Sequence, residues 1–155
     1  MIAMHGQRTF SRPLDEVLAK LSDARFLILH VPDVDESKPK EVDQASANCT
    51  IRPGFSFIRG TLRVELRILE SSESSDVRFS LSSKGIGSSS EAEAHLRLMA
   101  ENEATTKVDW TVEVTKLGGL LKAVPKGLIR GAAEKVINDV WAKMETSLNE
   151  EQTES

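Results

Sequence analysis

The side chains best suited to catalysis or metal binding are few and scattered in this sequence. The three histidines, His5, His30 and His95, lie far apart, and no pair has the spacing that places two metal ligands on one helix face. Cys49 is the single cysteine, and its place in an alternating stretch favours a small strand residue over a nucleophile. We therefore expect no metal site, no cofactor and no catalytic residue, and we interpret each histidine as a surface or boundary residue.

Charged and glycine-rich stretches offer two further kinds of chemistry. Arg59, Arg63 and Arg67 share one face of a predicted strand and could meet an acidic partner or lipid head groups, but a solvated outer sheet face is the favoured interpretation. Residues 82–90, SSKGIGSSS, contain a GxG pattern between two predicted strands. Because a phosphate-binding loop leads into a helix, this stretch is interpreted as a turn.

Length and composition indicate one small globular domain. The chain has 155 residues, of which 39% are hydrophobic and 28% charged, and its net charge is -4 without a long basic block. This balance argues against a nucleic-acid partner. The sequence has neither an apolar run of about 18 residues nor a leader pattern, so we expect a cytoplasmic protein without a membrane span. We expect a single domain over residues 1–149 and a disordered acidic tail over 150–155.

The elements that would position any site begin with one strand and two short helices. Ser11 followed by Pro13 marks the first helix start, with acidic residues in the first turn. Ser22 and Asp23 offer a cap for a second helix that Pro32 ends. Beyond Pro32 the apolar period changes from helical to alternating. Two weak strands are expected within 40–51, followed by strands over 58–68, 77–81, 92–98 and 106–114 joined by short turns. This order predicts an α+β fold with a curved antiparallel sheet of six or seven strands.

The last element is a long helix over residues 120–148 that covers the apolar face of the sheet. Its glycines and Pro125 weaken a helix, and one alternative is a break after Ala123 with Pro125 in the first turn of a new helix. The predicted apolar stripe comprises Leu121, Val124, Leu128, Ala132, Val136, Val140 and Met144, flanked by Ile129, Ala133 and Ile137.

Nearly the whole chain resembles the family of the carbon monoxide dehydrogenase G-type subunit, which belongs to the START-like superfamily, also called SRPBCC. The resemblance rests on four patterns: Gly6, Thr9, Phe10, Pro13, Glu16, Val17, Leu21 and Asp23, followed by Leu27 and Pro32; Gly60 on an inward strand; Thr106 with Trp110; and residues 117–120 before the last helix. It implies a helix-grip fold, in which the sheet wraps around the C-terminal helix over a hydrophobic cavity. It also implies a role in maturation or membrane recruitment of a molybdenum-containing dehydrogenase, with a quinone-like ligand.

On this fold, the inward residues predict a ligand cavity. The predicted lining is Phe26, Leu62, Val64, Phe79, Leu96, Thr106, Trp110, Leu121, Leu128, Gly131 and Ala132. Thr106 is its one clear polar member. The small residues of the helix, with Gly118 and Gly119 as a flexible entry, would leave room for a ligand, although close packing on the sheet explains small residues as well.

Three functions follow from this interpretation. The first is a non-catalytic carrier for an apolar lipid-, polyketide- or quinone-like molecule. The second is an accessory component of a dehydrogenase complex, and the third is a polyketide cyclase-like enzyme, which needs an inward polar pair that the sequence does not provide. We expect a monomer or weak dimer.

Overall fold

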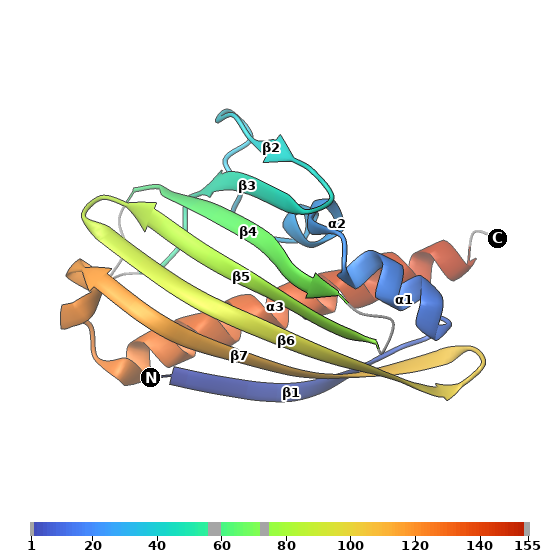
Figure 1. The fold of residues 1–155 in the computed structure, drawn as a ribbon. Coiled ribbons are helices and arrows are strands. Elements are labelled where there is room, and N and C mark those ends of the chain that lie inside the picture. The colour runs from blue at the N-terminus through green and yellow to red at the C-terminus, as the bar shows by residue number, and fades with distance from the viewer. Residues whose placement is uncertain (1, 56–59, 72–74, 154–155) are drawn as a thin grey trace.

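The computed structural model describes residues 2–55, 60–71 and 75–153, and its centre is a seven-stranded antiparallel sheet crossed by one long helix (Figure 1). The strands are β1 (Ile2–Phe10), β2 (Glu41–Val42), β3 (Ser46–Ile51), β4 (Leu62–Ser71), β5 (Asp76–Gly85), β6 (Ser88–Asn102) and β7 (Thr105–Gly119). The helices are α1 (Leu14–Leu21), α2 (Ala24–Leu29), the 3-10 helix η1 (Leu120–Ala123) and α3 (Lys126–Thr153).

The sheet confirms the predicted fold class. Its strand order is β1-β7-β6-β5-β4-β3-β2, so every neighbouring pair except β1 and β7 consists of consecutive strands. The first strand, β1, pairs antiparallel with the last, β7, and Gly6 lies opposite Trp110. Since apolar residues alternate along most strands, one face of the sheet is buried, and the curved sheet wraps partly around α3 (Figure 1).

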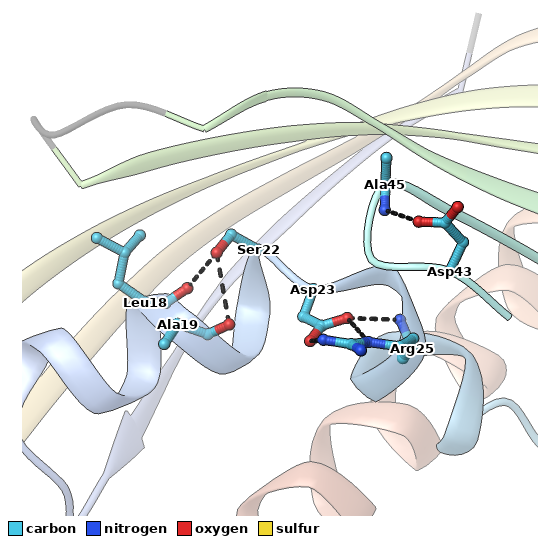
Figure 2. A network of polar contacts seen from close by, with 7 residues as sticks. All are labelled: Leu18, Ala19, Ser22, Asp23, Arg25, Asp43 and Ala45. Carbon is cyan, nitrogen blue, oxygen red and sulfur yellow. Dashed lines mark hydrogen bonds and ion pairs between the residues drawn. The ribbon is translucent and has the colours of Figure 1, made fainter.

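The two short helices follow β1 as predicted, and their junction is fixed by local polar contacts (Figure 2). The Ser22 hydroxyl donates to the Leu18 carbonyl at 2.7 Å and closes α1. Asp23 is the N-cap of α2 and accepts the backbone N–H of Arg25 at 2.9 Å. The side-chain hydrogen bond from Arg25 also lowers the pKa of Asp23. In the β2–β3 turn, an Asp43 carboxylate oxygen accepts the Ala45 N–H at 3.1 Å.

The strand predicted over 58–68 begins later than expected. Residues 56–59, which include Ile58 and Arg59, lie outside the described part of the chain. Gly60 precedes β4 and has a φ of +89°, so the prediction of an inward strand residue at Gly60 is wrong. A left-handed conformation ends the extended backbone, and a Cβ at Gly60 would lie 1.9 Å from Cδ1 of Ile86.

The C-terminal helix is broken, which confirms the alternative considered for Pro125. Val124 is extended with a ψ of 132° after η1, and the Pro125 carbonyl accepts N–H groups from Leu128 and Ile129 at 3.0 and 3.2 Å. Because proline has no N–H to lose, it is well suited to begin a helix. α3 runs to Thr153, so residues 150–153 of the expected tail belong to this helix.

Gly118 and Gly119 are not a flexible entry to the helix, because both belong to β7 and pair with Ser89 and Ser88 of β6. Gly119 has a φ of 60°, and a Cβ there would lie 1.8 Å from the Gly87 carbonyl oxygen. The glycine at 119 thus permits a close approach of two backbones immediately before η1.

Candidate ligand-binding site

The structure buries most of the predicted lining residues at the interface between the sheet and the helices. Seven apolar members are buried: Phe26, Leu62, Val64, Phe79, Leu96, Trp110 and Leu121. All of these except Leu62 belong to one contact cluster, which also contains Trp141 and Leu148 of α3. Sequence alternation therefore identified which face of β4, β5, β6 and β7 points inward.

Thr106, the polar member of the predicted lining, is fully buried and already has a partner. Its hydroxyl donates to the Arg12 carbonyl at 2.8 Å. This hydrogen bond joins β7 to the segment between β1 and α1. Thr106 therefore has a structural role, and its O–H is occupied by the protein.

Two predicted lining residues lie on the exposed face of α3, away from the sheet. Leu128 is 54% exposed, and Gly131 is exposed with open space where a Cβ would stand. The predicted stripe assumed one continuous helix from residue 120, but the break at Pro125 resets the helical phase. Counted from the buried Ile129, the inward stripe passes through Ala133, Ile137 and Val140 to the buried residues Trp141, Met144 and Leu148. Ala132 lies at the margin of this stripe and is half-buried.

Aromatic side chains fill the interface under the C-terminal half of α3. The Trp141 ring centroid lies 6.0 Å from that of Phe10 and 6.3 Å from that of Trp110. Trp141 was absent from the predicted stripe, although its spacing of three residues from Met144 and seven from Leu148 is the signal that a correct phase would have revealed. Trp110 is buried, and its Nε1 has no hydrogen-bond partner among the described residues.

Several apolar side chains toward the N-terminal half of α3 are only partly buried, although Ile129 in its first turn is buried. Here the sheet contributes Val112, Val114 and Leu117, and the helical segment contributes Ala133 and Ile137. These side chains pack against the core but remain partly exposed. We call these five residues the apolar seam.

A groove on the described surface lies outside the predicted lining, between α2 and the C-terminal half of α3. It has a volume of about 390 Å³ and is lined by His30, Ala142, Lys143, Thr146 and Ser147. His30 is buried, so its interpretation as a surface or boundary residue is wrong. Its Nδ1 lies 2.8 Å from the Phe26 carbonyl oxygen, and its Nε2 lies 2.8 Å from Ser147 Oγ. Since a carbonyl only accepts, Nδ1–H donates to Phe26, and in a neutral imidazole the Ser147 hydroxyl donates to Nε2.

A smaller recess of about 50 Å³ lies beside β2 and β3 and includes Cys49 among its lining residues. Cys49 is a buried strand residue, as predicted, and burial raises the pKa of its thiol. A raised pKa disfavours the thiolate that a nucleophile requires.

The described residues contain no cluster of three or more His, Cys, Asp or Glu side chains that could hold a metal ion. None of the helices within the described ranges has the length and apolar character needed to cross a bilayer. What the interface between sheet and α3 offers is apolar surface, together with the buried Trp110 indole N–H that finds no acceptor in the described part of the chain.

Comparisons with known proteins agree with this architecture. A family model described as the carbon monoxide dehydrogenase G-type subunit (CoxG) matches residues 6–149. No curated protein sequence matches the chain.

Solved structures share the fold at low sequence identity. A conserved protein from Geobacillus kaustophilus has 17% identity and a TM-score of 0.81, with 96% of each chain covered. A START superfamily protein from Mycobacterium smegmatis has 8% identity and a TM-score of 0.67, covering 96% of this chain and 97% of its own. Norcoclaurine synthase from Thalictrum flavum, in complex with dopamine and hydroxybenzaldehyde, has 13% identity and a TM-score of 0.59, covering 94% of this chain and 87% of its own. At these identities the likeness shows a START-like fold alone.

Proposed function

Because the chain belongs to the carbon monoxide dehydrogenase CoxG family, we propose that it is a non-catalytic binding or carrier module for an apolar small molecule. The ligand is a lipid-, polyketide- or quinone-like compound held between the sheet and α3. Support comes from a START-like fold whose buried surface is almost entirely apolar.

The observation that carries the proposal is the contrast between the two halves of the interface below α3. Bulky aromatic rings close the C-terminal half, whereas the apolar seam under the N-terminal half consists of smaller, partly exposed side chains. When a ligand covers apolar groups that are partly exposed to water, binding is favoured by about 25 cal/mol for each Å² of apolar surface removed from water. The seam is therefore where an apolar ligand would gain most.

The nearby Trp110 adds a contact of a different kind. Its buried Nε1–H has no acceptor among the described residues. An unpaired buried donor costs about 1–3 kcal/mol, and an oxygen atom on a ligand would recover part of that cost. Such a ligand would be apolar with a carbonyl or hydroxyl group, as quinones and polyketides are.

The test compares two enlargements of α3 on opposite faces. Ala133→Leu places three more carbons in the seam, whereas Gly131→Leu places a side chain in open space on the exposed face. Titration with a fluorescent fatty-acid or quinone analogue should give wild-type affinity for Gly131→Leu and at least tenfold weaker binding for Ala133→Leu.

A closed seam gives the opposite pattern. Ala133→Leu would then overpack the interface and lower the free energy of unfolding by about 1–3 kcal/mol, and the wild type would bind no probe. Native mass spectrometry of freshly purified protein, followed by lipid extraction, identifies a bound molecule directly. Failure of both the titration and the extraction would refute the carrier function.

A second role, as an accessory component of a dehydrogenase complex, is favoured by the family itself, whose description names carbon monoxide dehydrogenase. This role needs a protein interface rather than a ligand. A pull-down from the native organism with the tagged chain, with identification of the captured proteins by mass spectrometry, should recover a molybdenum-containing dehydrogenase. Recovery of other proteins alone would refute this role.

A further inference from the structure

The two edges of the sheet differ in how open they are to another chain. One edge ends in β2, which has two residues, one of them the charged Glu41. Residues 33–35 cover the rest of β3 at this edge, since Val34 bridges to Ile51. The other edge is β1, which pairs with β7 over nine residues without a bulge and runs along the lower edge of the sheet in Figure 1. Short or covered edges resist pairing with another chain, and β1 is the longer edge.

One contact shows which backbone groups of β1 face away from β7. Arg130 of α3 donates to the Ala3 carbonyl at 3.0 Å, so Ala3 faces outward, and His5, Gln7 and Thr9 follow at two-residue spacing. Apart from this contact, no hydrogen bond among the described residues reaches an outward N–H or C=O at these four positions. Since Arg130 occupies the edge at Ala3, the open stretch comprises His5, Gln7 and Thr9, with Gln7 at its midpoint.

The interior of the sheet gives the same alternation independently. The Leu98 N–H of β6 points toward β5, where it donates to the Ser75 carbonyl at 2.9 Å. The β7 partner of Leu98 is Val108, whose backbone groups therefore point to the other side, toward Arg8 of β1. The even-numbered residues of β1 thus bond to β7, and the odd-numbered residues face outward.

The exposed side chains of β1 are suited to pairing with an identical strand. Ala3, His5, Gln7 and Thr9 are exposed, and none of them is an acid, a lysine or an arginine. A foreign strand can match a charge with its opposite, but near a two-fold axis a charge meets its own copy and is repelled. Lack of such charges on the open edge therefore favours a second copy of the chain as the partner.

We propose that two copies of the chain pair antiparallel through β1 and form one continuous sheet. A two-fold axis at Gln7 places Gln7 opposite its own copy and His5 opposite Thr9 of the second copy. Each of these residue pairs exchanges two backbone hydrogen bonds. The opposed Gln7 side chains add contacts, since an amide both donates and accepts. This inference rests on the edge of the sheet alone and holds whether or not the seam carries a ligand.

Sedimentation equilibrium of the full chain measures the association. A small interface built from strand hydrogen bonds is weak, so we expect a monomer–dimer equilibrium with a Kd on the order of 0.1 mM. Amide hydrogen exchange at His5, Gln7 and Thr9 should slow as the protein concentration rises, because these amides gain acceptors only in the dimer. A chain that stays monomeric at about ten times the expected Kd would overturn the proposal. Association without slower exchange at these amides would overturn it as well.

The decisive variant is Gln7→Lys, because it separates pairing from folding. The Gln7 side chain is exposed, so the urea midpoint should not change, while like charges at the two-fold axis should raise the Kd by about tenfold or more. The matched control is Thr111→Lys, which adds the same charge to an exposed residue of β7, away from the edge. Its Kd should stay within about twofold of wild type, because water and salt screen the more distant charges. Equal effects of the two substitutions would overturn the proposal.

A charge exchange tests the position of the two-fold axis. Gln7→Glu should weaken association as Gln7→Lys does, but an equimolar mixture of the two variants should associate at least as tightly as wild type, because opposite charges then face each other. This rescue requires that position 7 meets its own copy, so its absence would overturn the proposal. Titration of Gln7→Lys with the apolar probe should give wild-type affinity, which keeps a failure of pairing distinguishable from a failure of ligand binding.

Discussion

Replacing Gly6 by alanine should destabilise the protein, although alanine normally loses less backbone entropy on folding than glycine. Gly6 lies in β1 directly opposite Trp110 of β7. An alanine Cβ would lie 2.7 Å from Cζ2 and 2.9 Å from Cε2 of the Trp110 ring. Carbon atoms in good contact are about 3.5–4.0 Å apart, so the ring must move by most of an ångström. Trp110 is buried against Trp141, and this limits the movement.

The expected magnitude combines two opposing effects. Overpacking in a core costs about 1–3 kcal/mol, and replacement of a strand glycine by alanine returns about 0.5–1 kcal/mol of backbone entropy. A net loss of about 1–2 kcal/mol in the free energy of unfolding follows. For a domain of this size the melting temperature should fall by about 2–4 °C per kcal/mol. Urea unfolding followed by tryptophan fluorescence measures the loss and reports on the displaced ring as well.

Replacing Gly131 by alanine is the control, and it should change the free energy of unfolding in the opposite direction. Gly131 lies inside α3 with open space at the Cβ position. Gly131→Ala should therefore stabilise the protein by up to about 1 kcal/mol through helix propensity alone. If Gly6→Ala is as stable as the wild type while Gly131→Ala behaves as expected, the interpretation of Gly6 as a space for the Trp110 ring is wrong.

Two further predictions concern polar contacts. Thr106→Val keeps the side-chain shape but leaves the Arg12 carbonyl without its 2.8 Å donor. It should lower the free energy of unfolding by about 1–3 kcal/mol in urea melts. Thr115→Val, at an exposed residue, should have almost no effect, and similar losses at both sites would contradict the assigned role of Thr106. Hydrogen bonds from Ser37 and Arg52 lower the pKa of Asp35 to about 2, so its carboxylate stabilises the fold above its unfolded pKa of about 3.9 and loses this effect as pH falls toward 2. Urea melts should show a wild-type advantage over Asp35→Asn at about pH 6 that shrinks between about pH 4 and pH 2, and a constant difference over that range would contradict the assignment.

Much of the fold could be predicted because most strands have one buried face. Alternation along β4 to β7 depends only on the two-residue period of a strand, and the inward positions Leu96, Val108 and Trp110 are buried as expected. The Asp23 cap of α2 also follows from local chemistry, since its side chain accepts a neighbouring backbone N–H. Ser22 instead closes α1.

The site was harder to predict because it depends on relations between distant segments. A single extended residue, Val124, reset the phase of α3 and moved Leu128 and Gly131 to the exposed face. The burial of His30 depends on its 2.8 Å contact with Ser147, a residue far away along the chain. The burial of His30 is therefore not encoded in the periodicity of its own segment, whereas the phase of α3 could have been found from the spacing of Trp141, Met144 and Leu148.

The pairing of β1 with β7 has a consequence for how the chain folds. Ile2 is paired with Val114 and Phe10 with Thr106, so the first strand finds its partner only across much of the length of the sequence. Contacts of such high sequence separation slow folding, because the loop between them must close before they contribute. During synthesis, Ile2, Met4 and Phe10 must wait for β7 to leave the ribosome. We therefore expect β1 to be the last strand to join the sheet and the segment most dependent on chaperones in the nascent chain.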